Sequence, residues 1–166
     1  YTKNDNFLFV LEPEDGGAFS TDTLAAVESL TEAAWQIPFA IRVDSISNFQ
    51  HTYGVEDELI VEDLFRNSFE MSTDERARRG AVALAEPLLR DQLVTSNGTV
   101  TAVNVVLQYP EKSLTEVPEA VAFARDLRQQ IETAHPNIDV SLTGVSMLNN
   151  AFAETGVSDV GTLMPI

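Results

Sequence analysis

The chain has 166 residues, enough for one domain, and 44% of them are hydrophobic, enough to form a buried core. Its 26 acidic and 10 basic residues give a formal net charge of −16, which repels nucleic-acid phosphates and anionic lipid headgroups. The absence of cysteine excludes disulfides, thiolate catalysis and cysteine-ligated metals. Uninterrupted apolar runs such as residues 7–11 are far shorter than the ~20 residues of a membrane helix, so we expect a soluble acidic domain without a nucleic-acid partner.

The first third of the sequence predicts a strand, a helix and a second strand. Residues 7–11 form a continuous apolar run that ends at a turn rich in Pro, Asp and Gly, which is typical of a buried central strand. Ser20 is a suitable N-cap for a helix whose apolar residues continue to Ala34, and Pro38 ends this helix. Residues 40–45 then alternate apolar and polar side chains, as a half-buried strand does.

The middle of the chain predicts a loop, a short strand and a second helix. Residues 47–57 are polar and aromatic without a clear period, which predicts a loop, whereas residues 58–64 predict a short strand. Ser72 and Glu75 form a capping box at the start of the helix, and Pro87 marks its end or a kink.

The last part of the chain predicts two strands and two helical segments. A Ser-Asn-Gly-Thr turn at residues 96–99 leads into residues 100–109, the longest predicted strand. Residues 116–134 carry one apolar stripe and predict the clearest helix. Residues 138–142 alternate as a strand does, and a final helical stretch begins at Gly144.

This order of elements predicts a single α+β domain. The elements fit a layered sandwich, and the nearest common arrangement is the ferredoxin-like split βαβ motif. In that arrangement the helices lie on one face of an antiparallel or mixed sheet.

The sequence contains no recognisable catalytic, cofactor or metal-binding motif. His51 and His135 lack metal-ligand spacing, and the calcium-loop and phosphate-loop patterns are absent. Acidic residues at 56–58 and 62–63 could bind a hard cation, but a solvated acidic loop is the better interpretation. We therefore predict no enzyme activity, no cofactor and no metal. Three arginines of the second predicted helix are expected to pair with nearby acids: Arg76, Arg78 and Arg79.

Four aromatic residues bracket the second and third predicted strands and are candidate substrate contacts: Phe49, Tyr53, Phe65 and Phe69. The commoner role of such residues is to hold a loop onto the sheet. The alternative is that they line a groove for an apolar ligand.

Five segments follow one another in a recognisable order: residues 43–49 (VDSISNF), 57–64 (DELIVEDL), 88–103, 140–144 (VSLTG) and 159–165 (D-x-x-x-L-x-P). Together they resemble the extracytoplasmic domain of exporters of the resistance-nodulation-division (RND) superfamily, in particular its MMPL-like branch. The chain also begins at Tyr1 without an initiator Met, and we expect it to be a piece of a longer protein.

The resemblance implies that residues 1–166 form one porter-like domain between two transmembrane helices, with residues from about 145 to 166 leading into the second helix. The complete protein would use the proton motive force to export hydrophobic or amphiphilic molecules, lipids being one candidate class. It would lie in the inner membrane of a bacterium or archaeon, with this domain on the periplasmic side. Its partners would be the transmembrane helices, a second loop domain and the substrate. The resemblance leaves undecided whether the protein forms a homo-oligomer. The proton-relay acids would lie in the membrane helices.

Two other functions stay open. The chain could be the extracellular ligand-binding sensor domain of a membrane receptor, or a small α+β enzyme with an acid–base pair such as His51 and Asp57. The exporter interpretation makes two structural predictions. The two ends of the domain should lie close together on one side of the sheet, and the last helix, including Leu163, should be partly disordered or swapped.

Overall fold

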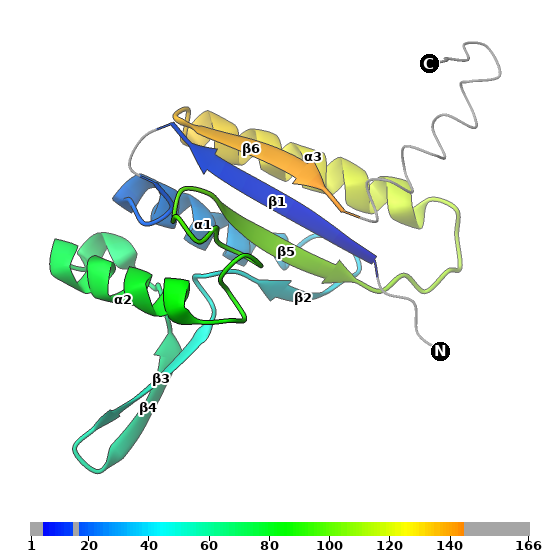
Figure 1. The fold of residues 1–166 in the computed structure, drawn as a ribbon. Helices are drawn as coiled ribbons and strands as arrows, with labels where there is room; N and C mark the ends of the chain where they lie inside the picture. The colour runs from blue at the N-terminus through cyan, green and yellow to red at the C-terminus, as the bar shows by residue number, and fades with distance from the viewer. Residues whose placement is uncertain (1–4, 15–16, 145–166) are drawn as a thin grey trace.

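The computed structural model describes residues 5–14 and 17–144 and shows an α+β fold (Figure 1). A four-stranded antiparallel sheet organises the described residues, and a separate two-stranded hairpin projects from this body. The elements in chain order are β1 (Asp5–Pro13), α1 (Thr21–Ala34), β2 (Ala40–Asp44), β3 (Gln50–Val55), β4 (Glu58–Asp63), the 3₁₀ helix η1 (Ser68–Glu70), α2 (Thr73–Ala85), β5 (Thr101–Leu107), α3 (Glu116–Ala134) and β6 (Ile138–Thr143).

The sheet has the strand order β2-β5-β1-β6, and each neighbouring pair is antiparallel. Strands β1 and β2 are therefore parallel with β5 between them, and β5 and β6 are parallel with β1 between them. Each of these pairs is joined by a helix, α1 or α3. The two interleaved units make the ferredoxin-like split βαβ arrangement, so the predicted fold class is confirmed.

Strand β1 lies inside the sheet, and one of its faces is apolar except for Asp5 at its start, which is buried on the same side. Phe7, Phe9 and Leu11 are fully buried toward the helices, while Leu8 and Val10 alternate with them on the other face and are half-buried. Each fully buried Leu or Phe contributes about 1.5–3 kcal/mol relative to an exposed side chain. This alternation gives the sheet one closed face and one partly open face.

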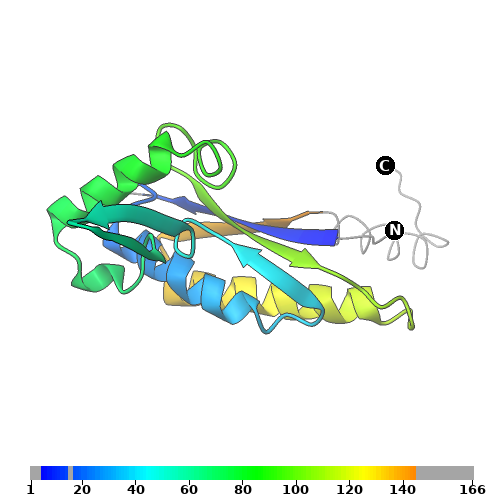
Figure 2. The same cartoon turned by 90° about the horizontal axis from the view of Figure 1, so that it is seen from below.

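Helices α1 and α3 cover the closed face, whereas α2 and the connector that follows it lie on the other side (Figure 2). Helix α1 begins where predicted, because the Ser20 Oγ accepts a hydrogen bond from the Thr23 amide at 3.3 Å. The apolar stripe of α3 is buried as its spacing predicts, from Ala120 to Ile131.

Two predictions about strands are wrong. Residues 50–55, predicted to be loop, form β3, whose backbone pairs with β4 in a register that places Gln50 opposite Asp63 and Tyr53 opposite Ile60. Both faces of this hairpin are partly exposed, so the apolar alternation that marks a half-buried strand is missing from its sequence. The strand predicted at residues 100–109 is shorter, and β1 with nine residues exceeds it.

The ends of the described chain lie side by side. Strand β6 ends against the start of β1, with Thr143 opposite Leu8. A Cβ added to Gly144 would lie 2.4 Å from the Asn6 carbonyl oxygen. The final helical stretch is predicted to begin at Gly144, and its residues 145–166, including Leu163, lie outside the described residues. Among those residues, no helix combines the length and apolar content needed to cross a bilayer.

Candidate functional site

An open groove lies over the partly open face of the sheet, between the sheet and the connector formed by residues 86–100. Its volume is about 670 Å³, within the range of small-molecule sites. Strands β1, β2 and β5, the turn after β2 and the connector all contribute to its wall. The lining residues are Asn6, Leu8, Arg42, Asp44, Ser45, Asn48, Phe49, Gln50, Leu88, Leu89, Gln92, Leu93 and Asn104.

The sheet provides a floor with polar and apolar parts. Leu8 on β1 lies directly opposite Asn104 on β5 in the strand register. The Nδ2 of Asn6 donates a hydrogen bond of 2.9 Å to the Oδ1 of Asn104. Within residues 5–14 and 17–144, the Asn104 Nδ2 group has no acceptor, so it remains available to a ligand.

The turn after β2 forms one wall of the groove. The Asn48 Oδ1 accepts a hydrogen bond from the Ser45 amide at 2.9 Å, and the Asn48 Nδ2 donates to the Val43 carbonyl at 2.7 Å. These bonds satisfy backbone groups that leave the sheet here. They also fix the position of Phe49, which follows directly and is half-buried against the core.

The opposite wall comes from the connector and consists of three leucines and Gln92. The Leu93 carbonyl accepts hydrogen bonds from the Ala102 amide at 2.9 Å and from the Thr101 Oγ1 at 2.7 Å, which ties the connector to the start of β5. Leu89 is buried and anchors the connector, whereas Leu88 is 70% exposed. An exposed leucine beside a groove is available for contact with an apolar ligand.

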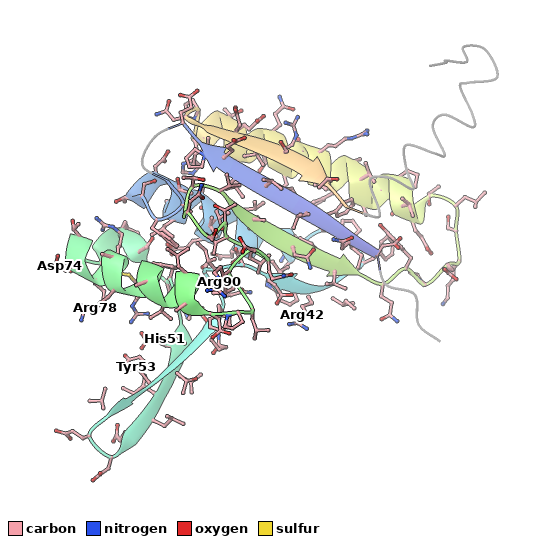
Figure 3. All side chains as sticks on the ribbon, viewed as in Figure 1. Arg42, His51, Tyr53, Asp74, Arg78 and Arg90 are labelled. Atoms are coloured by element: carbon pink, nitrogen blue, oxygen red, sulfur yellow. The ribbon has the colours of Figure 1, made fainter. Side chains whose placement is uncertain are left out.

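The groove combines a leucine-rich wall with carboxamide side chains and few charges. The charged residues among those that line the groove are Arg42 and Asp44. Their side chains form an ion pair with an Nε–Oδ2 distance of 2.9 Å. Figure 3 shows Arg42 projecting from β2. Such an arrangement fits an amphiphilic molecule better than a highly charged one.

The structure does not bring the four predicted contact residues together in one groove. Phe49 lines the groove. Phe65 is fully buried, with its ring centroid 5.8 Å from that of Phe19, so it does not reach the groove surface. Phe69 is 66% exposed in η1. Tyr53 lies on the hairpin, where its hydroxyl donates to the Glu62 Oε1 at 3.2 Å (Figure 3).

Most of the lining residues could not be identified from the sequence. The available signal was the alternation along β1 and β5, which assigns Asn6, Leu8 and Asn104 to the face opposite the apolar residues. The connector leucines have no periodic signal, because this segment is held by turns and bridges rather than by a helix or strand. Tertiary packing, rather than a local sequence pattern, determines which segment covers the open face of the sheet.

A cluster of charges joins the hairpin to α2. Arg79 donates to the Glu62 Oε2 at 2.5 Å, to the Glu75 Oε2 at 2.6 Å and to the Leu64 carbonyl at 2.8 Å. The hydrogen bonds from Arg79 lower the pKa of Glu62 and that of Glu75 below the usual carboxyl range. Partial burial would lower the pKa of Arg79, but its two carboxylate partners raise it.

The arginine prediction is confirmed for two residues of the three. Arg79 pairs with Glu62 and Glu75, and Arg78 pairs with Glu75. Arg76 instead donates to the Met71 carbonyl at 2.6 Å and to the Thr73 hydroxyl at 3.3 Å. This cluster therefore orders the junction between the hairpin and α2.

The histidines do not form an acid–base pair with the predicted acid. The ring of His51 stacks on Tyr53 with a centroid distance of 5.0 Å, and in the hairpin register His51 lies opposite Glu62. Asp57 lies in the hairpin turn, roughly 13 Å of strand away. The Nδ1 of His135 lies 2.6 Å from the Asp22 Oδ1. Among the described residues, no group of three or more His, Cys, Asp or Glu side chains converges as metal ligands.

Comparison of the chain with protein-family models and with curated proteins gives no match.

Proposed function

We propose that the chain is the extracytoplasmic, porter-like domain of a proton-driven exporter of the RND type, MMPL-like branch, that moves hydrophobic or amphiphilic molecules. The observation that carries this proposal is that the described ends meet at one end of the neighbouring strands β1 and β6, where Thr143 lies opposite Leu8. A domain with adjacent ends can be held between two helices that enter the same bilayer. The five sequence segments that resemble this branch support the same conclusion.

In this proposal the domain works mechanically. The two strands that would be attached to the membrane helices, β1 and β6, belong to the four-stranded sheet, so a force applied to them acts on the sheet as a whole. Proton-driven movement of the membrane helices would tilt the domain as a rigid body against a second loop domain. The groove would hold the substrate while this movement carries it away from the membrane.

Membrane topology tests the proposal. The chain has no cysteine, so a Leu59→Cys variant in a cysteine-free parent protein carries one thiol, on a side chain that is 73% exposed at the hairpin. We expect a membrane-impermeant maleimide to label it in intact cells. A Leu30→Cys variant is the matched control, because Leu30 is fully buried in α1 and should react only after unfolding.

Two outcomes would contradict the proposal. Labelling of Leu59→Cys only after cell lysis would place the domain on the wrong side of the membrane. A parent sequence with one or two membrane segments and a signalling domain would favour the sensor alternative, since an exporter of this type has about a dozen apolar helices in two repeats.

A further inference from the structure

We propose that the groove binds the uncharged, hydrogen-bonding head of an amphiphile, such as a sugar or an amide, together with the first part of its apolar tail. This inference deepens the proposed function, since it names the chemical class of the exported molecule. It depends on that function for the biological role of the ligand. The binding itself can be measured on the soluble chain.

The composition of the groove differs from that of the protein as a whole. The chain has a formal net charge of −16. The groove lining has one cation and one anion, Arg42 and Asp44, and they neutralise each other. Five lining residues carry carboxamides, which both donate and accept hydrogen bonds without a charge: Asn6, Asn48, Gln50, Gln92 and Asn104.

Two of these carboxamides are available to a ligand. Asn48 and Gln50 are already bonded, to the Val43 carbonyl and to the Asp63 carboxylate respectively. The side chain of Gln92 makes no hydrogen bond to the described part of the chain, and Asn104 has its Nδ2 group free there. Gln92 comes from the connector and Asn104 from the sheet, so a head group between them would be bonded from both sides.

The apolar part of the lining lies next to these amides. Leu8, Phe49 and Leu93 are partly buried, and Leu88 is largely exposed. A ligand with only polar groups would leave Leu88 in water, and a ligand with only apolar groups would leave the two carboxamides without partners. An amphiphile satisfies both parts of the groove at once.

A charged head fits less well. An anionic head would have to displace Asp44 from Arg42 and would approach against the net charge of the protein. A cationic head would find no unpaired carboxylate in the lining. Arg90 is exposed on the connector and is not part of the lining. An anionic head could still bind by pairing with Arg90.

Titration of the 166-residue chain with three dodecyl amphiphiles below their micellar concentrations tests this. The probes are the maltoside, the sulfate and the trimethylammonium salt, which share one tail and differ in head charge. We expect the maltoside to shift the side-chain amide NMR signals of Gln92 and Asn104, with an affinity about tenfold above the other two.

Paired variants locate the binding. Gln92→Leu removes a carboxamide that bonds no other described group, and we expect it to weaken maltoside binding by about five- to tenfold. Gln129→Leu makes the same chemical change on α3, outside this groove, and should leave binding unchanged. The amide spectrum of each variant reports whether it is folded.

The remaining outcomes would overturn the inference. Tighter binding of the sulfate, lost in Arg90→Gln, would show an anion site. Equal affinity for all three heads, unaffected by Gln92→Leu, would show a tail site without head recognition. Absence of binding by any probe would show that the groove takes no such ligand. None of these results would change the cysteine-labelling outcome, so failure of this inference is distinguishable from failure of the proposed function.

Discussion

A single guanidinium, that of Arg79, holds the projecting hairpin against α2. Its side chain is 11% exposed and bonds two carboxylates and the Leu64 carbonyl. We predict that Arg79→Met lowers the free energy of unfolding by about 2 kcal/mol, because a partly buried carbonyl loses its donor. Urea denaturation measures this. Arg78→Met is the matched control: its side chain is 72% exposed, so the change should stay within about 0.5 kcal/mol. Equal effects of the two variants would contradict this role.

The same cluster predicts how stability depends on pH. The pKa of Glu62 and that of Glu75 are lowered in the folded state by hydrogen bonds from Arg79. Their contribution is therefore present above the unfolded carboxyl pKa of about 4.3 and is lost as the pH falls through the lower folded values. Protonation of the other acids relieves self-repulsion in the wild type and in Arg79→Met alike, so the two proteins are compared. We expect the stability advantage of the wild type over Arg79→Met to shrink between about pH 5 and 3, and parallel profiles would show that the cluster does not contribute.

The backbone conformation at position 144 and its close approach to β1 require a glycine. Its φ angle is +120°, and a Cβ there would lie 2.4 Å from the Asn6 carbonyl oxygen. We predict that Gly144→Ala lowers the unfolding free energy by roughly 2–3 kcal/mol, through strain and loss of the close approach to β1. Gly54→Ala is the control, because its nearest contact is the Glu58 carbonyl oxygen at 3.9 Å and its φ is not positive. Thermal melting of the two variants should differ clearly, and similar melting would contradict this.

At the level of elements, the helices are predictable and the hairpin is not. The capping residues Ser20 and Ser72 accept hydrogen bonds from Thr23 and Glu75, as their spacing predicts. Helix α3 has the predicted bounds, Glu116–Ala134, because one face is a continuous apolar stripe. Strand β3 has no comparable signal, since its stability comes from pairing with β4 and from Arg79 rather than from a buried face.

The groove is predictable only in part, for a related reason. The aromatic residues that bracket the second and third predicted strands have a ligand groove as the less common of their two expected roles, and Phe49 does line the groove. Phe65 is near Phe49 in the sequence, but its ring packs on Phe19, which is far away in the sequence. Side-chain type therefore indicated the region. The path of the connector, which only tertiary contacts determine, decides which residues face the cavity.

The outer edge of β6 is protected by two side chains of α3. Arg128 donates to the Val140 carbonyl at 3.2 Å, and the Val140 amide donates to the Glu132 carboxylate at 3.1 Å. Together they occupy edge positions that another strand would use. We predict that the double variant Arg128→Ala/Glu132→Ala self-associates through this edge, which sedimentation or size-exclusion chromatography would detect.

A matched pair on the same helix controls for the loss of helix-surface contacts. Gln130 donates to Asp126 at 2.7 Å with the same spacing, and both are exposed. The double variant Asp126→Ala/Gln130→Ala should stay in the wild-type oligomeric state. Association of both variants alike, or of neither, would show that the Arg128–Glu132 pair does not protect the edge.

On the scale of the whole molecule, the two described ends of the chain are separated from the hairpin. The start of β1 and the end of β6 lie at one end of the body, and the hairpin lies at the other in both views (Figures 1 and 2). The residues between β2 and β5 supply the hairpin, α2 and the connector wall of the groove. One long insertion into a ferredoxin-like core therefore accounts for each feature that the simple fold does not require.

The net charge acts on the molecule as a whole. A formal net charge of −16 destabilises the compact state by self-repulsion, and salt screens charges separated by more than about 10 Å at 0.1 M. We predict that the melting temperature rises between roughly 0.05 and 0.5 M NaCl, by about 3 °C for each kcal/mol of repulsion removed. Attractive pairs such as Arg79 with Glu62 are screened too, but they are fewer than the uncompensated acids.

A charge-reduced variant separates self-repulsion from other effects of salt. Glu56, Asp57 and Glu58 lie exposed at the hairpin turn, and replacing them with Gln, Asn and Gln removes three negative charges far from the core. Its melting temperature should exceed that of the wild type at low salt and converge with it at high salt, because screening then removes the same repulsion in both. A melting temperature that falls with added salt would instead mean that the ion pairs joining the hairpin to α2 outweigh the repulsion among the remaining acids.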